Sequence, residues 1–312
     1  SRGAMLTGCY PNRIGFETFG RAHVLFPGHR WGLNPSEITI ARLLKNAGYS
    51  TQMVGKWHCG DQPEFLPTEH GFDHWYGLPY SNDMGRQGTG IPIEFREQMT
   101  EHLGIELQEG DYPPLPLMLD QEVQEEQPDQ AALTERYLQE SVRFMREKQD
   151  EPFFLYFAHL YVHLPIYVQP RFMGESRNGS YGAAVRCIDW ALDVLLHELE
   201  ALGLTDDTVV IFTSDNGALA REGEGSNAPL RAKKGTTWEG GQRVPCIVRW
   251  PGDVASGATA SAVTTAMDLY PTIAGWCGAD VPTDRTVDGR DLDALLRGDT
   301  DESPHEAFFY YR

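Results

Sequence analysis

The sequence predicts an α/β fold with a mostly parallel central sheet and helices on both faces. The main observation is the run of β-branched and aromatic residues at 209–212, because a strand covered on both sides is apolar at every position. Residues 50–54 and 153–158 form two further strand-like runs. Segments with helical spacing of apolar residues lie between these runs, as in sheets whose parallel strands are joined by helices.

Helices are predicted where apolar residues recur at helical spacing near a capping residue. Residues 1–8 fit the first turns of a helix, and Ser36 is placed to cap a second helix that ends before Gly48. Asp129 is placed to cap a third. Further helices are predicted at residues 181–202, with an apolar stripe that faces the core, and at residues 292–296. Another helix is predicted to begin near residue 268, with Pro271 in its first turn, and a strand is predicted at residues 246–249.

Between residues 84 and 128 the periodicity gives way to Gly, Pro and acidic residues. This pattern predicts a long surface excursion over one edge of the sheet, where substrate-specific loops often lie. The chain has 312 residues and no internal repeats, so we expect one α/β domain over residues 1–312, with the excursion at 84–128.

Composition excludes some functions. The net charge of −19 argues against a nucleic-acid surface, and no apolar run is long enough to span a bilayer. The five cysteines are scattered without zinc or disulfide spacing, and most are expected to be buried. The chain starts at Ser1 without an initiator Met or a targeting pattern, which indicates a fragment and leaves the compartment open.

Asp215, Asn216 and Gly217 follow the run at 209–212. Ligands of open α/β sheets bind beyond the carboxyl ends of the strands, so this strand delivers a carboxylate and an amide oxygen to that edge. Both are oxygen ligands suited to Ca²⁺ or Mg²⁺. Taken alone, Ser-Asp-Asn-Gly is more typical of a plain turn, but the neighbouring motifs favour the ligand interpretation.

Lys56 and His58 follow the strand at 50–54. If they keep the strand's period of two, they share one face, and a cation beside an imidazole suits an anion site with a proton-transfer group. A surface lysine and a packed histidine would be the ordinary alternative. Lys56 and Lys234 are two of only five lysines in the chain, which favours a specific role for them.

Three further segments carry cations or histidines. Arg2 lies at a helix start, where a positive charge is unfavourable unless an anion is bound there. His159 and His163 follow the strand at 153–158, so one or both should reach the same edge as Asp215. The loop at 231–245 combines Lys234 with several glycines, which allow the backbone to approach an oxyanion closely.

Together these segments resemble the sulfatase family of the alkaline-phosphatase-like superfamily. In that family a Cys or Ser, any residue, Pro-Ser-Arg and then Leu-Thr-Gly mark the nucleophile, and the chain matches everything after the Pro. The likeness is greatest to the branch of arylsulfatase A and N-acetylgalactosamine-6-sulfatase. The matching segments are Ser1-Arg2, Leu6-Thr7-Gly8, Gly48-Tyr49-Ser50-Thr51, Gly55-Lys56-Trp57-His58-Cys59-Gly60, residues 152–165, Ser180-Tyr181-Gly182, Ser214-Asp215-Asn216-Gly217, residues 234–245 and Phe309-Tyr310-Tyr311-Arg312.

The resemblance implies a sulfuric ester hydrolase whose formylglycine nucleophile lies three residues upstream of Ser1. Asp215 and Asn216 would hold Ca²⁺, with Mg²⁺ as the alternative. Arg2 and Lys56 would stabilise the nucleophile, and His58 would take a proton when sulfate is expelled. His163, which alone stands in the family's His-x-Pro position, and Lys234 would bind sulfate and help to protonate the leaving alcohol.

The chain departs from the family in two ways: it lacks the Asp-Asp pair of the first strand and the C-terminal antiparallel subdomain. We therefore expect a fragment that is truncated at both ends and that is inactive on its own. The implied substrate is an aryl or carbohydrate sulfate, with a small ester or a terminal sulfated sugar favoured because the outer surface is acidic. The resemblance also implies an extracytoplasmic location. The alternatives are a phosphomonoester or phosphodiester hydrolase of the same superfamily and a non-catalytic oxyanion-binding relative.

Overall fold

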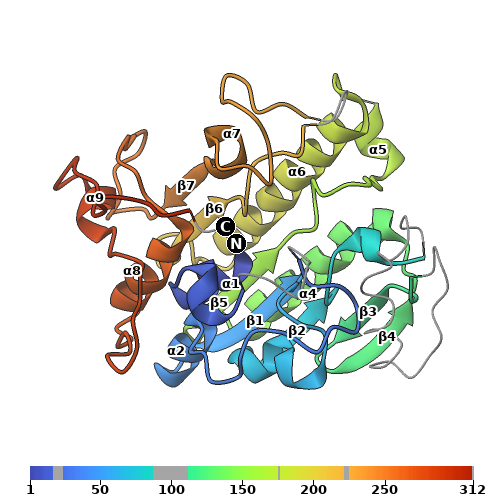
Figure 1. Cartoon of the computed structure of the whole chain (residues 1–312), viewed down its shortest axis with the longest axis horizontal. Helices are drawn as coiled ribbons and strands as arrows, with labels where there is room; N and C mark the ends of the chain where they lie inside the picture. Colours follow the sequence, from blue (N-terminus) through green and yellow to red (C-terminus); the bar gives the residue numbers. More distant parts are fainter. Residues whose placement is uncertain (17–23, 87–111, 175, 221–224, 311–312) are drawn as a thin grey trace.

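The computed structural model describes residues 1–16, 24–86, 112–174, 176–220 and 225–310 (Figure 1). The α-helices are α1 (Arg2–Thr7), α2 (Ile40–Asn46), α4 (Leu133–Glu147), α5 (Pro170–Met173), α6 (Gly179–Ala201), α7 (Glu239–Gln242), α8 (Leu269–Trp276) and α9 (Asp293–Arg297). The strands are β1 (Ser50–Gly55), β2 (His74–Gly77), β3 (Pro116–Leu119), β4 (Glu122–Glu126), β5 (Phe153–Ala158), β6 (Val210–Thr213) and β7 (Cys246–Arg249).

The main sheet has the strand order β4-β3-β2-β1-β5. β1 pairs in parallel with both β2 and β5, whereas β3 pairs antiparallel with β2 and with β4. Successive residues of β1 enter different cores, Met53 on one face and Val54 on the other. Helices α4 and α6 cover the Val54 face, and α1, α2 and α8 cover the Met53 face. The sheet is therefore mixed, with the predicted helices on both faces.

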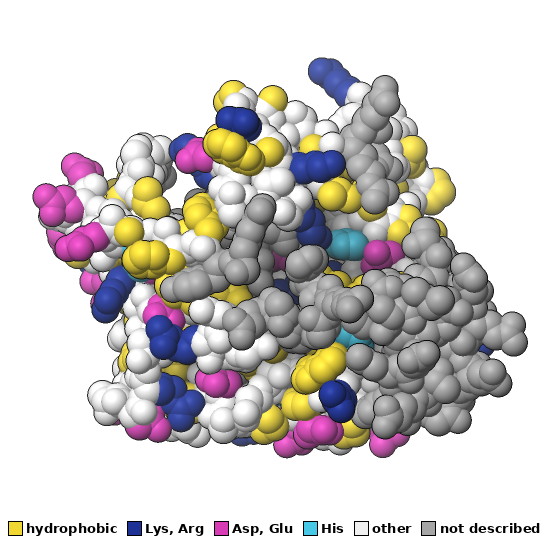
Figure 2. All heavy atoms as spheres, in the orientation of Figure 1, with side chains coloured by type: hydrophobic (Ala, Val, Ile, Leu, Met, Phe, Trp, Pro, Cys, Tyr) yellow, Lys and Arg dark blue, Asp and Glu magenta, His cyan; other side chains and the backbone are white. Residues whose placement is uncertain are grey.

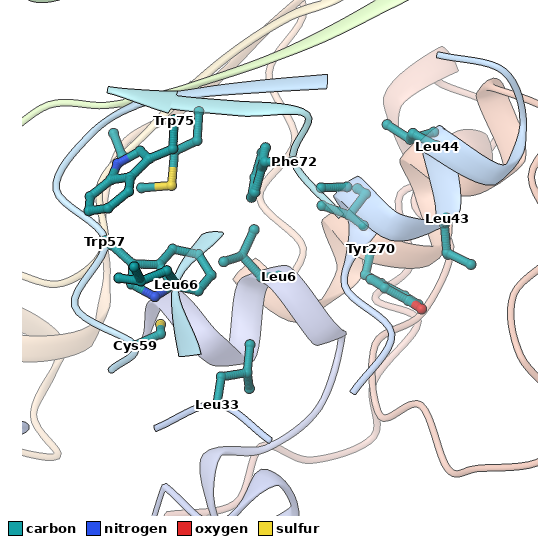
Figure 3. Close-up of a cluster of buried hydrophobic side chains, with 14 of the residues drawn as sticks. Leu6, Leu33, Leu43, Leu44, Trp57, Cys59, Leu66, Phe72, Trp75 and Tyr270 are labelled. Carbon is teal, nitrogen blue, oxygen red and sulfur yellow. The ribbon is translucent and has the colours of Figure 1, made fainter. Parts of the chain in front are cut away.

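The core on the Met53 face sets the direction of the segment after β1 (Figure 3). Trp57 and Cys59 are fully buried in it, beside Leu6 of α1, and the indole nitrogen of Trp57 donates to the Phe65 carbonyl oxygen at 2.8 Å. The burial of Trp57 and Cys59 fixes this segment, and Lys56, the residue before Trp57, directs its amine to Ser81 instead.

The prediction that residues 209–212 form a central parallel strand is wrong. β6 instead pairs antiparallel with β7 in a two-stranded sheet, and its side chains are only partly buried. An apolar run identifies a strand but carries no information about which strand pairs with it. The runs at 50–54 and 153–158 do form the adjacent parallel strands β1 and β5.

Three local predictions also differ from the structure. The excursion predicted at 84–128 contains the hairpin of β3 and β4, which extends the main sheet, while its residues 87–111 lie outside the described residues. The cap of α2 is Thr39, whose hydroxyl accepts from the Arg42 amide, whereas Ser36 lies in a turn that Asn34 stabilises. Val185, assigned to the core stripe of α6, is 46% exposed.

The other helices begin where the sequence indicates. Asp129 accepts from the Ala131 amide and caps the short turn that leads into α4. Cys9, Cys59 and Cys187 are buried, as expected of small apolar side chains, while Cys246 is exposed. In the described part of the chain no helix combines the length and the apolarity needed to cross a membrane.

Candidate active site

The predicted site residues come from segments that follow β1, β5 and β6 and from the start of α1. The last residue of β1, Gly55, is paired with the last residue of β5, Ala158, so the two parallel strands end at the same edge. In Figure 2 cationic, histidine and acidic side chains lie beside one another in a hollow near the centre of the face shown. The structure thus brings chain segments far apart in sequence to one place.

Lys56 is buried at this edge, with its side chain amine 3.0 Å from the Ser81 hydroxyl oxygen, to which it donates. Its backbone amide continues the pairing of β1 with β5 by donating to the Ala158 carbonyl oxygen at 2.9 Å. Burial, together with the nearby charge of Arg2, lowers the pKa of Lys56 to about 7. Keeping a buried amine charged costs free energy, and an anion that binds beside it lowers that cost.

His58 has a backbone φ of +60°, a left-handed conformation that only a few per cent of non-glycine residues adopt. Its amide donates to the Pro79 carbonyl oxygen, and its Nε2 lies 3.0 Å from the Leu25 carbonyl oxygen. A carbonyl can only accept, so Nε2 carries the hydrogen and Nδ1 is the nitrogen that can take a proton. Burial and the charge of Lys56 hold the pKa of His58 well below its ordinary value, which keeps the ring neutral.

The two histidines after β5 have different surroundings. His159 uses both ring nitrogens internally, Nε2 with the Thr134 hydroxyl at 3.0 Å and Nδ1 as acceptor from the Tyr161 amide at 2.9 Å. His163 instead lies beside Ser81, and its pKa is lowered to about 4 by burial and by the charges of Lys56 and Lys234. His163 therefore lies beside Ser81 and near the charges of Lys56 and Lys234, whereas His159, on which the charge of Arg2 acts, has both ring nitrogens engaged in internal hydrogen bonds.

Asp215 and Arg2 meet across the site, with 3.8 Å between the carboxylate Oδ2 and the guanidinium Nε. Arg2 also donates through Nη1 to the Lys56 carbonyl oxygen at 2.6 Å. Burial raises the pKa of Asp215, but the charges of Arg2, Lys56 and Lys234 outweigh it and lower this pKa below its ordinary value. Asp215 is thus an ionised carboxylate, 38% exposed, in a group of cations.

The loops that carry Asp215 and Lys234 are joined through backbone contacts. Gly217 donates to the Gly241 carbonyl oxygen at 3.1 Å, and the Lys234 amide donates to the Ala218 carbonyl oxygen at 3.0 Å. A Cβ at Gly217 would lie 1.9 Å from the Gly240 carbonyl oxygen, so only glycine permits this approach. Lys234 affects the pKa values of Lys56, His163 and Asp215, which locates its charge in the same group.

Sequence reasoning missed Ser81 and Asp83. Ser81 is buried between Lys56 and His163, and Asp83 Oδ1 lies 4.0 Å from His163 Nδ1. Both follow β2, which runs parallel to β1 and so ends at the same edge. The signal that could have identified them is the run of polar residues after the strand at 74–77, by the rule that was applied to Asp215.

Comparison with known proteins identifies the architecture. A family model described as Sulfatase matches residues 1–279. The chain belongs to the sulfatase family. This result confirms the resemblance drawn from the motifs.

Among sulfatases with curated names, the steryl-sulfatase of Mus musculus is 38% identical over an alignment covering 100% of this chain and 59% of the relative. The N-acetylgalactosamine-6-sulfatase of Rattus norvegicus is 39% identical, with 100% and 58% covered. A crystal structure of Ps i-CgsB in complex with k-i-k-neocarrahexaose superimposes with a TM-score of 0.77 at 30% identity, covering 97% of this chain and 66% of that one. The chain therefore spans a little over half the length of these two curated relatives.

Proposed function

We propose that the full-length protein is a sulfatase that hydrolyses aryl or carbohydrate sulfate esters with a bound divalent cation. The observation that supports this most is the arrangement of Lys56, His163 and Lys234 around Ser81 and Asp215 at one sheet edge. Together with Arg2, the two lysines provide three cations beside the neutral imidazole, and this set suits a tetrahedral oxyanion whose charge then develops on a leaving oxygen. Membership of the sulfatase family favours sulfur over phosphorus as the centre attacked.

Among the described residues, Asp215 and Asn216 carry the oxygen ligands that a hard divalent cation prefers. Asp215 is ionised and half exposed, and Asn216 adds an amide oxygen in the next position. Among the residues that the structure covers, no three His, Cys, Asp or Glu side chains gather as a ligand group. Asp215 and Asn216 would hold Ca²⁺, or Mg²⁺ as the alternative, with further oxygen ligands from elsewhere. When bound, such an ion draws charge from the sulfate oxygens.

The cations of this chain bind and orient the ester. Lys56 is buried and fixed by Ser81, so little reorganisation is needed when a sulfate oxygen approaches its amine. An arriving anion raises the pKa of Lys56 from about 7 and so secures its charge. The formylglycine that the family resemblance places upstream of Ser1 would supply the attacking hydroxyl.

The two site histidines have distinct proton tasks. His58 is neutral with Nδ1 available, so it can accept a proton when sulfate leaves the nucleophile. His163 donates its Nδ1 hydrogen to the Leu164 carbonyl oxygen at 2.8 Å, which leaves Nε2 to exchange a proton with the leaving alcohol. The opposite tautomers of the two rings follow from their backbone partners.

Turnover of matched esters tests the function. With the full-length protein, 4-nitrophenyl sulfate is expected to be hydrolysed at least about 100-fold faster, in kcat/KM, than 4-nitrophenyl phosphate. The same panel includes N-acetylgalactosamine 6-sulfate and an intact sulfated polymer, and the small esters should be preferred because the acidic outer surface repels a polyanion. Faster hydrolysis of the phosphate ester would contradict the proposed reaction, and no turnover of any ester would favour a binding role.

Gly217→Ala tests the loop contact. The added Cβ cannot fit beside the Gly240 carbonyl, so the loop carrying Asp215 must shift, and kcat/KM for 4-nitrophenyl sulfate should fall by about 100-fold. Gly174→Ala is the matched control, since a Cβ there meets no atom of the described residues within 4 Å. Equal activity of the two variants would show that the contact between the loops does not position the site.

A further inference from the structure

Asp83 is an acidic side chain next to a cationic site. It lies in the short turn Asn82–Met84 that follows β2, and its Oδ1 is 4.0 Å from Nδ1 of His163. The side chain is 40% exposed, yet Oδ1 itself is buried and accepts no hydrogen bond from the described part of the chain. A buried carboxylate oxygen without a donor is costly, so its position calls for a functional explanation.

The hydrogen bonds of His163 show which nitrogen faces Asp83. Nδ1 donates to the Leu164 carbonyl oxygen, so this nitrogen carries a hydrogen in both the neutral and the charged ring. The Ser81 hydroxyl is 3.3 Å from Nδ1 and 3.4 Å from Nε2, and therefore does not select one nitrogen. Asp83 lies on the Nδ1 side, opposite to the nitrogen that exchanges its proton. It can stabilise the charged ring without competing for that proton.

Two neighbouring cations oppose the protonation of His163, whereas the carboxylate of Asp83 favours it. Burial, Lys56 and Lys234 lower the pKa of His163, and the Asp83 carboxylate raises it. A ring that must donate a proton to a leaving group needs a negative charge of this kind. Among the described residues, further titratable groups that act on the pair include His58, which acts with His163, and Tyr112 and Lys56, which act with Asp83.

We propose that Asp83 is a positioning residue for His163: the Leu164 carbonyl oxygen keeps Nδ1 protonated, and the Asp83 carboxylate on the same side of the ring stabilises the imidazolium that protonates the leaving alcohol. In this step the bond between sulfur and the ester oxygen breaks and its electron pair stays on that oxygen. A new bond forms between sulfur and the attacking oxygen, and the proton of the attacking hydroxyl is released to water. The proton on Nε2 moves to the ester oxygen and leaves a neutral ring. The proposal rests on the sulfatase function and adds one residue to the group that protonates the leaving alcohol.

Asp83→Asn separates charge from shape. In this variant the pKa of His163, followed by NMR of labelled histidine in the 312-residue chain, should fall by about half a unit or more. In the full-length protein, kcat for an alkyl sulfate should fall about 10-fold and kcat for 4-nitrophenyl sulfate less than about 2-fold, because a good leaving group needs little protonation. The alkaline limb of the kcat profile should move to lower pH, and Asp83→Glu should restore part of the loss.

Asp120→Asn is the matched control. Asp120 lies 3.3 Å from Nδ1 of His74 on another part of the sheet, and its φ of +55° suits Asn. This variant should leave the His163 titration and all rates unchanged. An unchanged His163 titration in Asp83→Asn, or an equal loss for all esters, would overturn the role of Asp83 while the sulfatase function stands. A wild-type protein that hydrolyses no sulfate ester would refute the function itself, and the proton-donor role with it.

Discussion

Lys56→Met is expected to abolish most turnover and to make the protein more stable. Loss of the cation should lower kcat/KM for 4-nitrophenyl sulfate by about 100- to 1,000-fold in the full-length protein, the range found when one oxyanion donor is removed. Without substrate, the wild-type lysine is a buried charge near Arg2, and its replacement by an apolar side chain of similar length relieves that cost. The expected gain in the free energy of unfolding at pH 6.5 is on the order of 2 kcal/mol.

The pH dependence of this gain has a definite sign. The pKa of Lys56 is about 7 in the folded chain and about 10.4 in an unfolded one, so the unfolded state binds more protons between these values. The wild-type protein therefore recovers stability as pH rises from 7 towards 10, and the advantage of Lys56→Met should shrink over that window. Calorimetric unfolding at pH 6.5 and 9.5 measures both effects.

Lys45→Met is the control for Lys56→Met, because Lys45 forms an exposed ion pair with Asp73 at 2.6 Å. Its loss should slightly destabilise the protein and leave activity unchanged. If Lys56→Met were less stable than wild type at pH 6.5, the description of Lys56 as a strained cation that awaits an anion would be wrong.

Asp215→Asn should remove the divalent cation and with it the activity. The substitution keeps the size of the side chain and one oxygen ligand but removes the charge that a hard cation needs, so Ca²⁺ affinity measured by titration calorimetry should fall at least about 100-fold. Turnover of 4-nitrophenyl sulfate should fall about 1,000-fold, with partial recovery at high Ca²⁺. Elemental analysis of the wild-type protein should find calcium or magnesium rather than zinc.

Asp207→Asn is the matched control for Asp215→Asn, since Asp207 is exposed and precedes β6 whereas Asp215 follows it. It should bind Ca²⁺ and turn over substrate like the wild type. Unchanged Ca²⁺ affinity in Asp215→Asn would remove this residue from the proposed ligand set.

Strands β1, β5 and β6 could be predicted because each is marked by its composition and by the polar residues that follow it, whereas β2 was not predicted. The prediction that Lys56 and His58 share one face assumes an extended segment, whereas His58 adopts a left-handed φ that sequence spacing does not reveal. The choice of His163 over His159 needed the family resemblance. The structure supplies a physical reason, because both nitrogens of His159 are already hydrogen-bonded.

The features that could not be predicted are the pairing of strands and the contacts between distant side chains, rather than the positions of the helices and strands. The run at 209–212 forms a strand, but pairing depends on long-range geometry that an apolar run does not encode, so its place beside β7 was missed. Ser81 and Asp83 follow the short strand β2, which has only four residues and gives a weak signal. Their proximity to Lys56 and His163 arises from the parallel pairing of β1 and β2, which becomes visible only in three dimensions.

A crystal structure of the protein with Ca²⁺ and inorganic sulfate tests the site most directly. We expect the ion on the oxygens of Asp215 and Asn216, and a sulfate oxygen within hydrogen-bond distance of the Lys56 amine and of His163 Nε2. Calcium bound elsewhere, or sulfate bound away from Lys56, would contradict the claim that these segments together form the binding site of one sulfate ester.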